Sequence, residues 1–387
     1  MGAIYYTRAS GIEMLCSYGI QTRGDLCDRS FTMFSSDNGQ TWSEPEVSKT
    51  EIEKSDGILR RRPMVAVLDK QKDRFIWFFN EGFFDGEDPL QGMLRYQLRY
   101  RVSSDGGHTW DTDELMIQEG EEFDKNHPFP DVWVGHNSMM IGDQSCVPLI
   151  DSEGNLWVPA QMCPLGPDKI YYNPGGGYTY HHTVIISGSW KDDSTIDWRL
   201  SGVVKGDPKR STRGLLEPTI GKLEDGRMLM VMRGSNDVKP NLLGYRWVSI
   251  FNKHKEIWSM PLPWTYTDGE QFHSPSSCSQ LLHHSSGRLL WIGNLCRENP
   301  QGNRPRYPLI IAEVDTKTGL LIRNSIKILD DRSPSESERL TLSNFHVLED
   351  RKSHEILITL PRYFAQVPMD NVADFSANLT LIKVKLK

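Results

Sequence analysis

The stretch that decides the fold is Ser35-Ser36-Asp37-Asn38-Gly39-Gln40-Thr41-Trp42, which returns as Ser103-Ser104-Asp105-Gly106-Gly107-His108-Thr109-Trp110. Both copies fit the pattern S-x-D-x-G-x-T-W. An Asp at the first corner of a turn can accept backbone N–H groups, and Gly supplies the positive φ that closes the turn. The Thr-Trp pair then enters a strand with a large apolar anchor. The octapeptide therefore predicts a hairpin turn that occurs in repeated units.

A second periodic signal supports these units in the part of the chain where the octapeptide fades. Gly154, Gly226 and Gly287 each precede an apolar run, and their separations are similar to the one between the two octapeptides. Such glycines are typical of tight turns that lead into buried strands. Residues 315–319 read as a remnant of the octapeptide, and so do residues 249–258, where only Trp258 survives clearly.

Together these signals predict an all-β chain that folds as a six-bladed β-propeller. Short β-rich runs recur throughout, and apolar residues nowhere keep a 3.6-residue period over three turns. Units of about 65 residues with four short strands fit propeller blades better than a sandwich. We expect a single domain over residues 1–387, with residues 379–385 as a ring-closing strand. The predicted blades are 1–50, 51–125, 126–205, 206–265, 266–333 and 334–387.

Composition and charge exclude several classes of protein. The chain has 38% hydrophobic and 25% charged residues, which is typical of a globular protein. Its net charge of −7, without a basic run, argues against nucleic acid as a partner. No stretch resembles a membrane span or an export signal, so membrane association is not expected. Localisation stays open, because the chain as written fits a cytoplasmic protein or an exported one whose signal has been removed.

The six cysteines and the known site motifs give no sign of a cofactor. Cysteines occur at positions 16, 27, 146, 163, 278 and 296, without the spacing of a zinc site or a disulfide scaffold. We interpret them as mostly buried thiols. A phosphate loop and the common hydrolase and zinc motifs are also missing. No cofactor and no metal are expected.

The repeats and their spacing resemble the sialidase superfamily of six-bladed propellers, in which such octapeptides are called Asp boxes. The resemblance covers essentially the whole chain. In that family the boxes lie on outer turns, away from the central funnel, so it implies a structural role for both copies. It also implies a glycan or glycoconjugate as the partner and a glycoside hydrolase activity.

Three residues match the family's site. Glu217 precedes a strand, a D-G turn follows at Asp225-Gly226, and Arg233 closes the next strand at a separation similar to the family's. The resemblance implies that Glu217 acts as the base on the nucleophile and that Arg233 grips the substrate carboxylate, for which the planar guanidinium fork is suited. A second carboxylate-binding arginine is expected at Arg306, with Arg304 in reserve.

The sequence departs from the family in two places. The R-I-P tripeptide is missing before the first octapeptide, and Arg62 in Arg60-Arg61-Arg62-Pro63 is at best a displaced substitute. The family's nucleophilic Tyr belongs in the last blade, where Leu342 stands instead. Because the anomeric carbon of a sialoside carries a carboxylate, a neutral Tyr is a better attacker than a second anion. The alternatives left open are a paired-carboxylate route, a histidine, or another Tyr such as Tyr307.

For the general acid, the family's Asp in the first blade points to Asp28, with Asp25 beside it. His136, flanked by Trp133 and Asn137, is a candidate proton-transfer group. Adjacent residues on a strand point to opposite faces, so the pair His181 and His182 gives only weak support for a shared metal.

Three functions follow from these residues. The first is an exo-acting glycoside hydrolase that releases a terminal acidic sugar. The second is a lyase or hydrolase for uronate-containing glycans on the same propeller. The third is a glycan-binding propeller without catalysis, which Leu342 and the missing R-I-P both permit.

Overall fold

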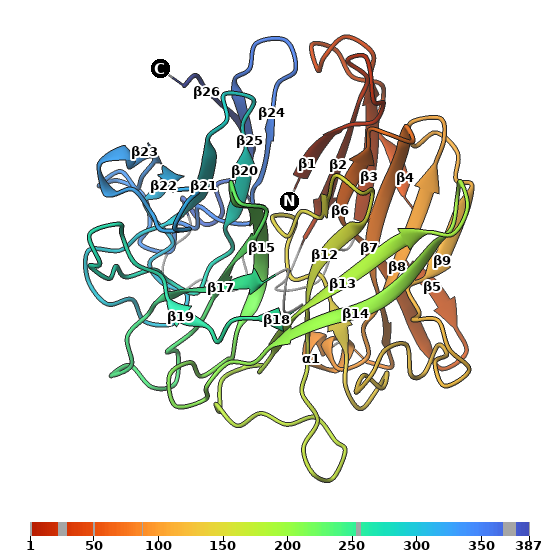
Figure 1. Ribbon diagram of the computed structural model, residues 1–387, viewed down its shortest axis with the longest axis horizontal. Coiled ribbons are helices and arrows are strands. Elements are labelled where there is room, and N and C mark those ends of the chain that lie inside the picture. Colours follow the sequence, from red (N-terminus) through yellow and green to blue (C-terminus); the bar gives the residue numbers. More distant parts are fainter. Residues whose placement is uncertain are drawn as a thin grey trace. The chain divides into compact units, whose positions relative to one another are not determined.

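The computed structural model describes residues 2–21, 29–48, 51–86, 88–252, 257–366 and 377–386. In this part of the chain, strands dominate and form six sheets that follow one another along the sequence (Figure 1). The all-β prediction is confirmed, and the six sheets are the blades of a six-bladed β-propeller. Each sheet lies inside one of the six predicted blade ranges.

Contacts divide the chain into two compact units, and the division passes through strands β13 and β14 of the third sheet. The first unit comprises residues 1–172 and 184–201, and the second comprises 173–183 and 202–387. Whether residues 1–387 behave as a single domain stays a prediction.

The first unit contains most of the first three sheets, and Figure 1 shows β6, β7 and β8 side by side in the second of them. The first sheet contains β1 (Gly2–Tyr6), β2 (Met14–Ile20), β3 (Arg29–Ser35) and β4 (Glu46–Ser48). The second contains β5 (Glu51–Lys54), β6 (Gly57–Asp69), β7 (Arg74–Phe84), β8 (Gln97–Ser103) and β9 (Thr112–Leu115), with helix α1 (Pro89–Met93) between β7 and β8. The third contains β10 (Met139–Met140), β11 (Leu149–Ile150), β12 (Leu156–Met162), β13 (His182–Trp190) and β14 (Ile196–Val204).

The second unit contains the other three sheets. The fourth sheet contains β15 (Leu216–Lys222), β16 (Met228–Arg233), β17 (Arg246–Asn252), β18 (Ile257–Trp258) and β19 (Leu262–Pro263). The fifth contains β20 (Gln280–His283), β21 (Leu289–Asn294), β22 (Leu309–Val314) and β23 (Lys327–Asp330), with the 3-10 helix η1 (Arg323–Ser325) before β23. The sixth contains β24 (His346–Glu349), β25 (Ile356–Pro361) and β26 (Leu379–Val384). Strand β26 covers most of the predicted ring-closing segment and pairs antiparallel with β25.

Both octapeptides form the same hydrogen-bonded turn. The carboxylate of Asp37 accepts the backbone N–H of Thr41 at 2.8 Å and its hydroxyl at 2.6 Å, and Asp105 accepts the same two groups of Thr109 at 2.8 and 2.7 Å. Gly39 has φ +74°, as the turn requires. Hydrogen bonds from the Thr41 hydroxyl and backbone lower the pKa of Asp37 to about 2. The carboxylates are therefore the groups that hold these turns closed.

The turn recurs in two further blades. Asp315 accepts the N–H of Lys317 and the hydroxyl of Thr318, as expected for a remnant of the octapeptide. Asp192 accepts the N–H and hydroxyl of Thr195 in the same way, although the sequence pattern did not single it out. Part of the predicted remnant near Trp258, residues 253–256, lies outside the described residues.

The cores lie between the apolar faces of the sheets. In the first unit, Phe78 and Tyr100 meet the edge of Trp198, with ring centroids 5.9 and 5.1 Å away. In the second unit, the rings of Trp264 and Trp291 pack with centroids 5.3 Å apart, in a cluster that also contains residues of β16, β21 and β22. The cysteines support the interpretation as buried thiols, since Cys16, Cys146, Cys163 and Cys278 are buried and Cys296 is half-buried. Cys27 lies outside the described residues.

We expect Asp105→Ala to destabilise the protein by about 1–2 kcal/mol, because two hydrogen bonds from Thr109 and one from Ser103 are lost. Partial burial would raise the pKa of Asp105, but these bonds outweigh it and lower the pKa. A depressed folded-state pKa gives stability that is present above the unfolded pKa and lost as pH falls below about 4. The gap between wild type and variant in urea denaturation should therefore shrink below that pH. Asp111→Ala, at an exposed residue of the same loop, is the control; equal loss in both variants would contradict the assignment.

Candidate functional site

The hairpin β15–β16 positions Glu217 and Arg233. Leu216 pairs with Arg233 and Thr219 with Val231, so the register shifts between them and leaves Glu217 and Pro218 in an irregularity of the strand. Glu217 adopts φ +49°. Such a conformation is unfavourable for a residue with a side chain and persists only where the surrounding structure holds it, often at functional sites.

Glu217 and Arg233 form a nearly buried ion pair. Nη2 of Arg233 lies 2.8 Å from Oε1 of Glu217, and the two residues are 7% and 8% exposed, respectively. A pair this far removed from water costs desolvation energy, so the loss of one partner would leave a buried charge. The sequence separation between the two residues thus corresponds to a contact across one hairpin.

Arg306 joins this pair through the backbone of Ser276. The carbonyl oxygen of Ser276 accepts Nη1 of Arg233 at 3.2 Å and Nη2 of Arg306 at 3.3 Å. Nη1 of Arg306 also donates to Oγ of Ser343 at 3.1 Å. Burial and the positive charge of Arg233 lower the pKa of Arg306 to about 10, so it stays charged at neutral pH. The structure therefore brings Glu217, Arg233 and Arg306 together, whereas the reserve residue Arg304 is exposed.

A third arginine, Arg246, is buried next to the site and holds part of its backbone in place. Arg246 lies opposite Arg233 in the β16–β17 register and is fully buried. Its Nη1 donates to the carbonyl oxygen of Ser277 at 2.7 Å, and its Nη2 donates to Oγ of Ser274 at 3.0 Å. Arg246 thereby anchors residues 274–279, which we call the serine segment and which present the carbonyl of Ser276.

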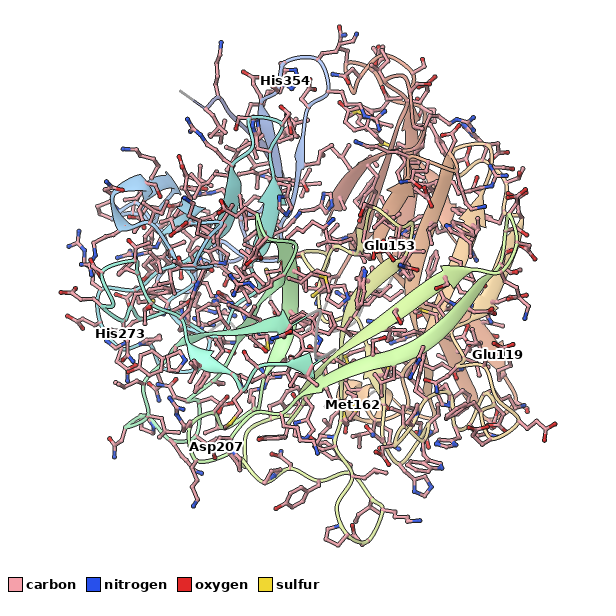
Figure 2. All side chains as sticks on the ribbon, viewed as in Figure 1. Glu119, Glu153, Met162, Asp207, His273 and His354 are labelled. Atoms are coloured by element: carbon pink, nitrogen blue, oxygen red, sulfur yellow. The ribbon has the colours of Figure 1, made fainter. Side chains whose placement is uncertain are left out.

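The serine segment follows His273, which is labelled in Figure 2. The His273 ring stacks on Tyr245, with centroids 6.3 Å apart. Oγ of Ser274 donates to the carbonyl oxygen of Asn294 at 2.8 Å, which ties the segment to β21. Its serines are small enough to be buried here, and the hydroxyls of Ser274 and Ser277 both accept hydrogen bonds from Arg246.

Arg213 and His181 lie beside these arginines. Nη2 of Arg213 donates to Oγ1 of Thr179 at 2.6 Å, and a Cβ on Gly175 would lie 2.1 Å from the carbonyl oxygen of Thr212, so only glycine permits this approach. His181 is buried, and among the described residues neither of its ring nitrogens has a hydrogen-bond partner. Burial and the charges of Arg213 and Arg233 hold the pKa of His181 well below its usual value. His181 is therefore a neutral imidazole.

The charges of this cluster do not balance. Within the described part of the chain, the one carboxylate ion-paired with Arg233, Arg246 or Arg306 is that of Glu217. Three guanidinium groups against one carboxylate leave a formal excess of two positive charges. Planar guanidinium groups in a poorly solvated site favour a carboxylate ligand.

Leu342 provides no reactive group. Its side chain is fully buried and packs with Leu340, Phe345 and Ile358 in the core of the sixth sheet. Its backbone N–H donates to the carbonyl oxygen of Arg306 at 3.0 Å, which places the next residue, Ser343, against the Arg306 guanidinium. Tyr307 packs its ring against the same core.

The other predicted site residues lie elsewhere in the chain. Arg62 is in β6 of the first unit, opposite Asn80. His136, also in the first unit, is exposed, and its Nδ1 lies 3.2 Å from the carbonyl oxygen of Lys169. Asp25 and Asp28 lie outside the described residues. The roles of Arg62, His136 and Asp28 stay predictions.

Two further properties concern the described ranges as a whole. They contain no group of three or more His, Cys, Asp or Glu residues arranged to hold a metal ion. They also contain no helix with the length and apolar character needed to cross a bilayer.

The fold is that of a sialidase-like six-bladed propeller. The chain is similar over its whole length to the NanB sialidase of Streptococcus pneumoniae, with 13% identity, 68% of that chain covered and a TM-score of 0.63. It is also similar to the intramolecular trans-sialidase of Ruminococcus gnavus in complex with oseltamivir carboxylate, with 12% identity, 100% of this chain and 94% of that chain covered, and a TM-score of 0.61. A protein of unknown function from Dyadobacter fermentans aligns with 11% identity, 99% and 94% coverage and a TM-score of 0.61. No protein-family model and no curated protein matches the sequence. At these identities the likeness shows the fold alone.

Sequence reasoning missed Arg246, Arg213, Ser343 and the serine segment. One signal was available for Arg246, because an arginine within the strand-like run Tyr245-Arg246-Trp247-Val248 must find partners if the strand is buried. The run Ser274-Pro275-Ser276-Ser277-Cys278-Ser279 looks like a solvated loop, yet Ser274, Ser276 and Ser277 are all buried.

We expect Leu342→Tyr to destabilise the protein by about 1–3 kcal/mol without creating activity, because the larger ring overpacks the core of the sixth sheet. Urea denaturation and a fluorogenic sialoside assay measure the two effects. Leu342→Met, which conserves volume, is the matched control and should cost less than about 1.5 kcal/mol. A stable, more active tyrosine variant would show that position 342 faces the arginines.

Proposed function

We propose that this chain is an exo-acting glycoside hydrolase that releases a terminal acidic sugar, sialic acid or a related sugar, from a glycan. The observation that carries the proposal is the pairing of Arg233 and Arg306 on one carbonyl oxygen with a single carboxylate beside them. This arrangement has excess positive charge and guanidinium donors, which suit the carboxylate of an acidic sugar. The sialidase-like fold supports the same substrate class by analogy.

The two arginines retain donors for a ligand. Arg233 uses Nη1 and Nη2 within the protein, while its Nε has no partner among the described residues. Each guanidinium carries five N–H donors, so both groups can bind a carboxylate and keep the bond to Ser276. We assign carboxylate recognition to Arg233 and Arg306.

Glu217 is the proposed base. In hydrolysis, the bond between the anomeric carbon and the leaving oxygen breaks and a water oxygen takes its place. Because Leu342 offers no hydroxyl, we assign the attack to water, whose proton Glu217 accepts. The proton for the leaving oxygen comes from a general acid, for which Asp28 remains the candidate by resemblance.

A second candidate function rests on Leu342 itself. A fully buried leucine at the expected nucleophile position is compatible with a propeller that binds acidic sugars and does not turn them over. Turnover of sialosides selects hydrolysis, and ultraviolet absorbance from an unsaturated product of a uronate glycan selects elimination. Saturable binding without turnover across a broad glycan panel selects the binding protein.

Glu217→Gln should lower kcat for the substrate by at least about 100-fold while the affinity for the free acidic sugar changes little, because the base is lost and the arginines remain. Steady-state kinetics and calorimetry measure the two quantities. A fully active Glu217→Gln variant would show that Glu217 is not the base.

Arg306→Met should weaken binding of N-acetylneuraminic acid or glucuronic acid by about 10- to 100-fold, since charge-assisted hydrogen bonds are lost. Arg304→Met, two positions away and exposed, is the matched control and should bind like wild type. Equal affinities in both variants, or equal affinity for the sugar and its methyl ester, would contradict carboxylate recognition.

A further inference from the structure

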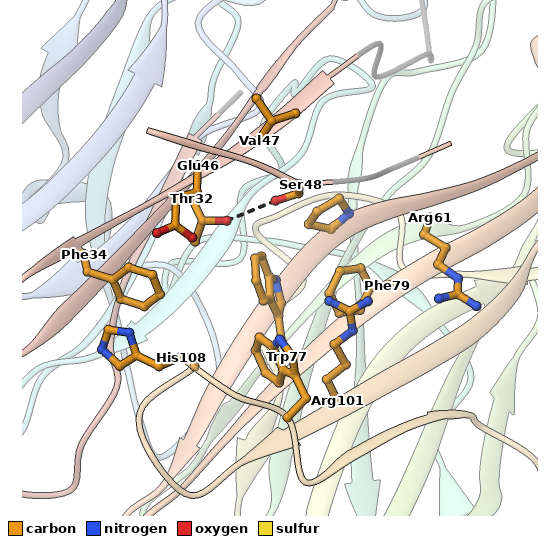
Figure 3. A pocket seen from close by; sticks show the side chains of 13 residues that line it. Thr32, Phe34, Glu46, Val47, Ser48, Arg61, Trp77, Phe79, Arg101 and His108 are labelled. Atoms are coloured by element: carbon orange, nitrogen blue, oxygen red, sulfur yellow. Dashed lines mark hydrogen bonds between the residues drawn. The ribbon is translucent and has the colours of Figure 1, made fainter. Parts of the chain in front are cut away.

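A pocket of about 350 Å³ lies within the first unit, between the first and second sheets (Figure 3). Strands β3 and β4 contribute one side, and β6, β7 and β8 contribute the other. Gly107, His108 and Trp110 of the second octapeptide complete the lining. The volume is at the lower end of the range for small-molecule sites, which suits a ligand of one ring.

The pocket and the packed core lie on opposite faces of the second sheet. On the opposite face of the second sheet, Phe78 and Tyr100 close on Trp198. Side chains alternate along a strand, so Trp77, Phe79 and Arg101 share the face that lines the pocket.

Aromatic rings form much of the wall. Phe34 and His108 stack with centroids 4.1 Å apart, and Trp77 packs 5.7 Å from Trp110. Figure 3 shows Phe34 and His108 together on one side of the pocket and Trp77 near Arg101 on the other. Trp77 is buried, whereas His108 is exposed and Phe34 is half-buried, so the Phe34–His108 pair is the part of the wall open to the apolar face of a sugar ring.

The cations of the pocket are already neutralised. Nε of Arg61 lies 2.7 Å from Oε2 of Glu81, and Nη2 of Arg101 lies 3.2 Å from Oδ2 of Asp113. Arg99 bridges both acids at 2.8 and 2.7 Å. Burial alone would raise the pKa of Asp113, but the bonds and charges of Arg99 and Arg101 outweigh it and lower the pKa. Three arginines exceed these two acids by one formal charge, and the Glu46 carboxylate of the pocket lining balances it, so an anion would find little net charge here.

A cationic ligand is also disfavoured. The guanidinium of Arg101 already lies over Phe79 at 4.8 Å and over Trp110 at 5.5 Å, so a cation occupies these ring faces. Polar groups remain available around them. The hydroxyls of Thr32 and Ser48 lie 3.0 Å apart, and the exposed Glu46 carboxylate also lines the pocket.

From these features we propose that the pocket binds a neutral sugar ring of a glycan. The Phe34–His108 pair takes its apolar face, while Glu46 and the hydroxyls of Thr32 and Ser48 pair with its hydroxyl groups. The site is separate from the arginine cluster of the second unit and does not depend on the proposed hydrolase activity.

The test uses the full chain with D-galactose and N-acetyl-D-glucosamine as probes, observed by tryptophan fluorescence and saturation-transfer NMR. We expect saturable binding that His108→Ala and Glu46→Ala each weaken at least about fivefold. Both residues are exposed, and unfolding midpoints equal to wild type confirm that the variants fold. Glu44→Ala, exposed on the neighbouring loop and outside the pocket, is the matched control and should bind like wild type.

Two comparators decide the ligand class. Sodium sulfate and tetramethylammonium chloride should not compete with the sugar. Tighter binding of either ion, or sugar binding that survives both pocket substitutions, overturns the proposal. Glu217→Gln should bind the neutral sugar as tightly as wild type does. The two proposals can therefore fail independently of each other.

Discussion

The carbonyl oxygen of Ser276 is the point on which the arginine cluster depends. It accepts one N–H from Arg233 and one from Arg306, and so holds two like charges next to each other. Coulomb repulsion and loss of hydration both oppose this arrangement. One backbone dipole and the carboxylate of Glu217 offset part of that cost. A bound anion would offset more of it, which supports the acidic ligand of the proposed function.

The same constraint explains why a third arginine is buried nearby. Arg246 donates to Ser274 and Ser277 on either side of Ser276, and these bonds fix the backbone that presents the shared carbonyl. Removing Arg246 would leave buried acceptors without donors and release the segment. Arg246 is thus a positioning residue, while Arg233 and Arg306 face the ligand in the proposed function.

The fold could be predicted from the sequence because its signals are local. The Asp37 and Asp105 turns close within one octapeptide, and Glu217 meets Arg233 across a single hairpin of two consecutive strands. The bonds of Arg246 connect residues 28 to 31 positions apart, from β17 to the serine segment before β20, and no pattern in the sequence sets that packing. The ion pairs that link Arg61, Glu81, Arg99 and Asp113 likewise depend on the register of four strands, which the sequence alone does not give. The turn at Asp192 was missed because it lacks the Gly and Trp positions of the octapeptide.

In the proposed function, Glu217 and the ligand's carboxylate compete for one guanidinium. While Arg233 is paired with Glu217, its positive charge compensates that of the carboxylate. Under that proposal, a sugar carboxylate that draws Arg233 toward itself would weaken the pairing and free Glu217 to accept a proton from water. A neutral sugar cannot produce this exchange. With a leucine at 342 and water as the attacker, this coupling becomes the main reason to expect turnover to depend on the negative charge of the substrate as well as on its affinity.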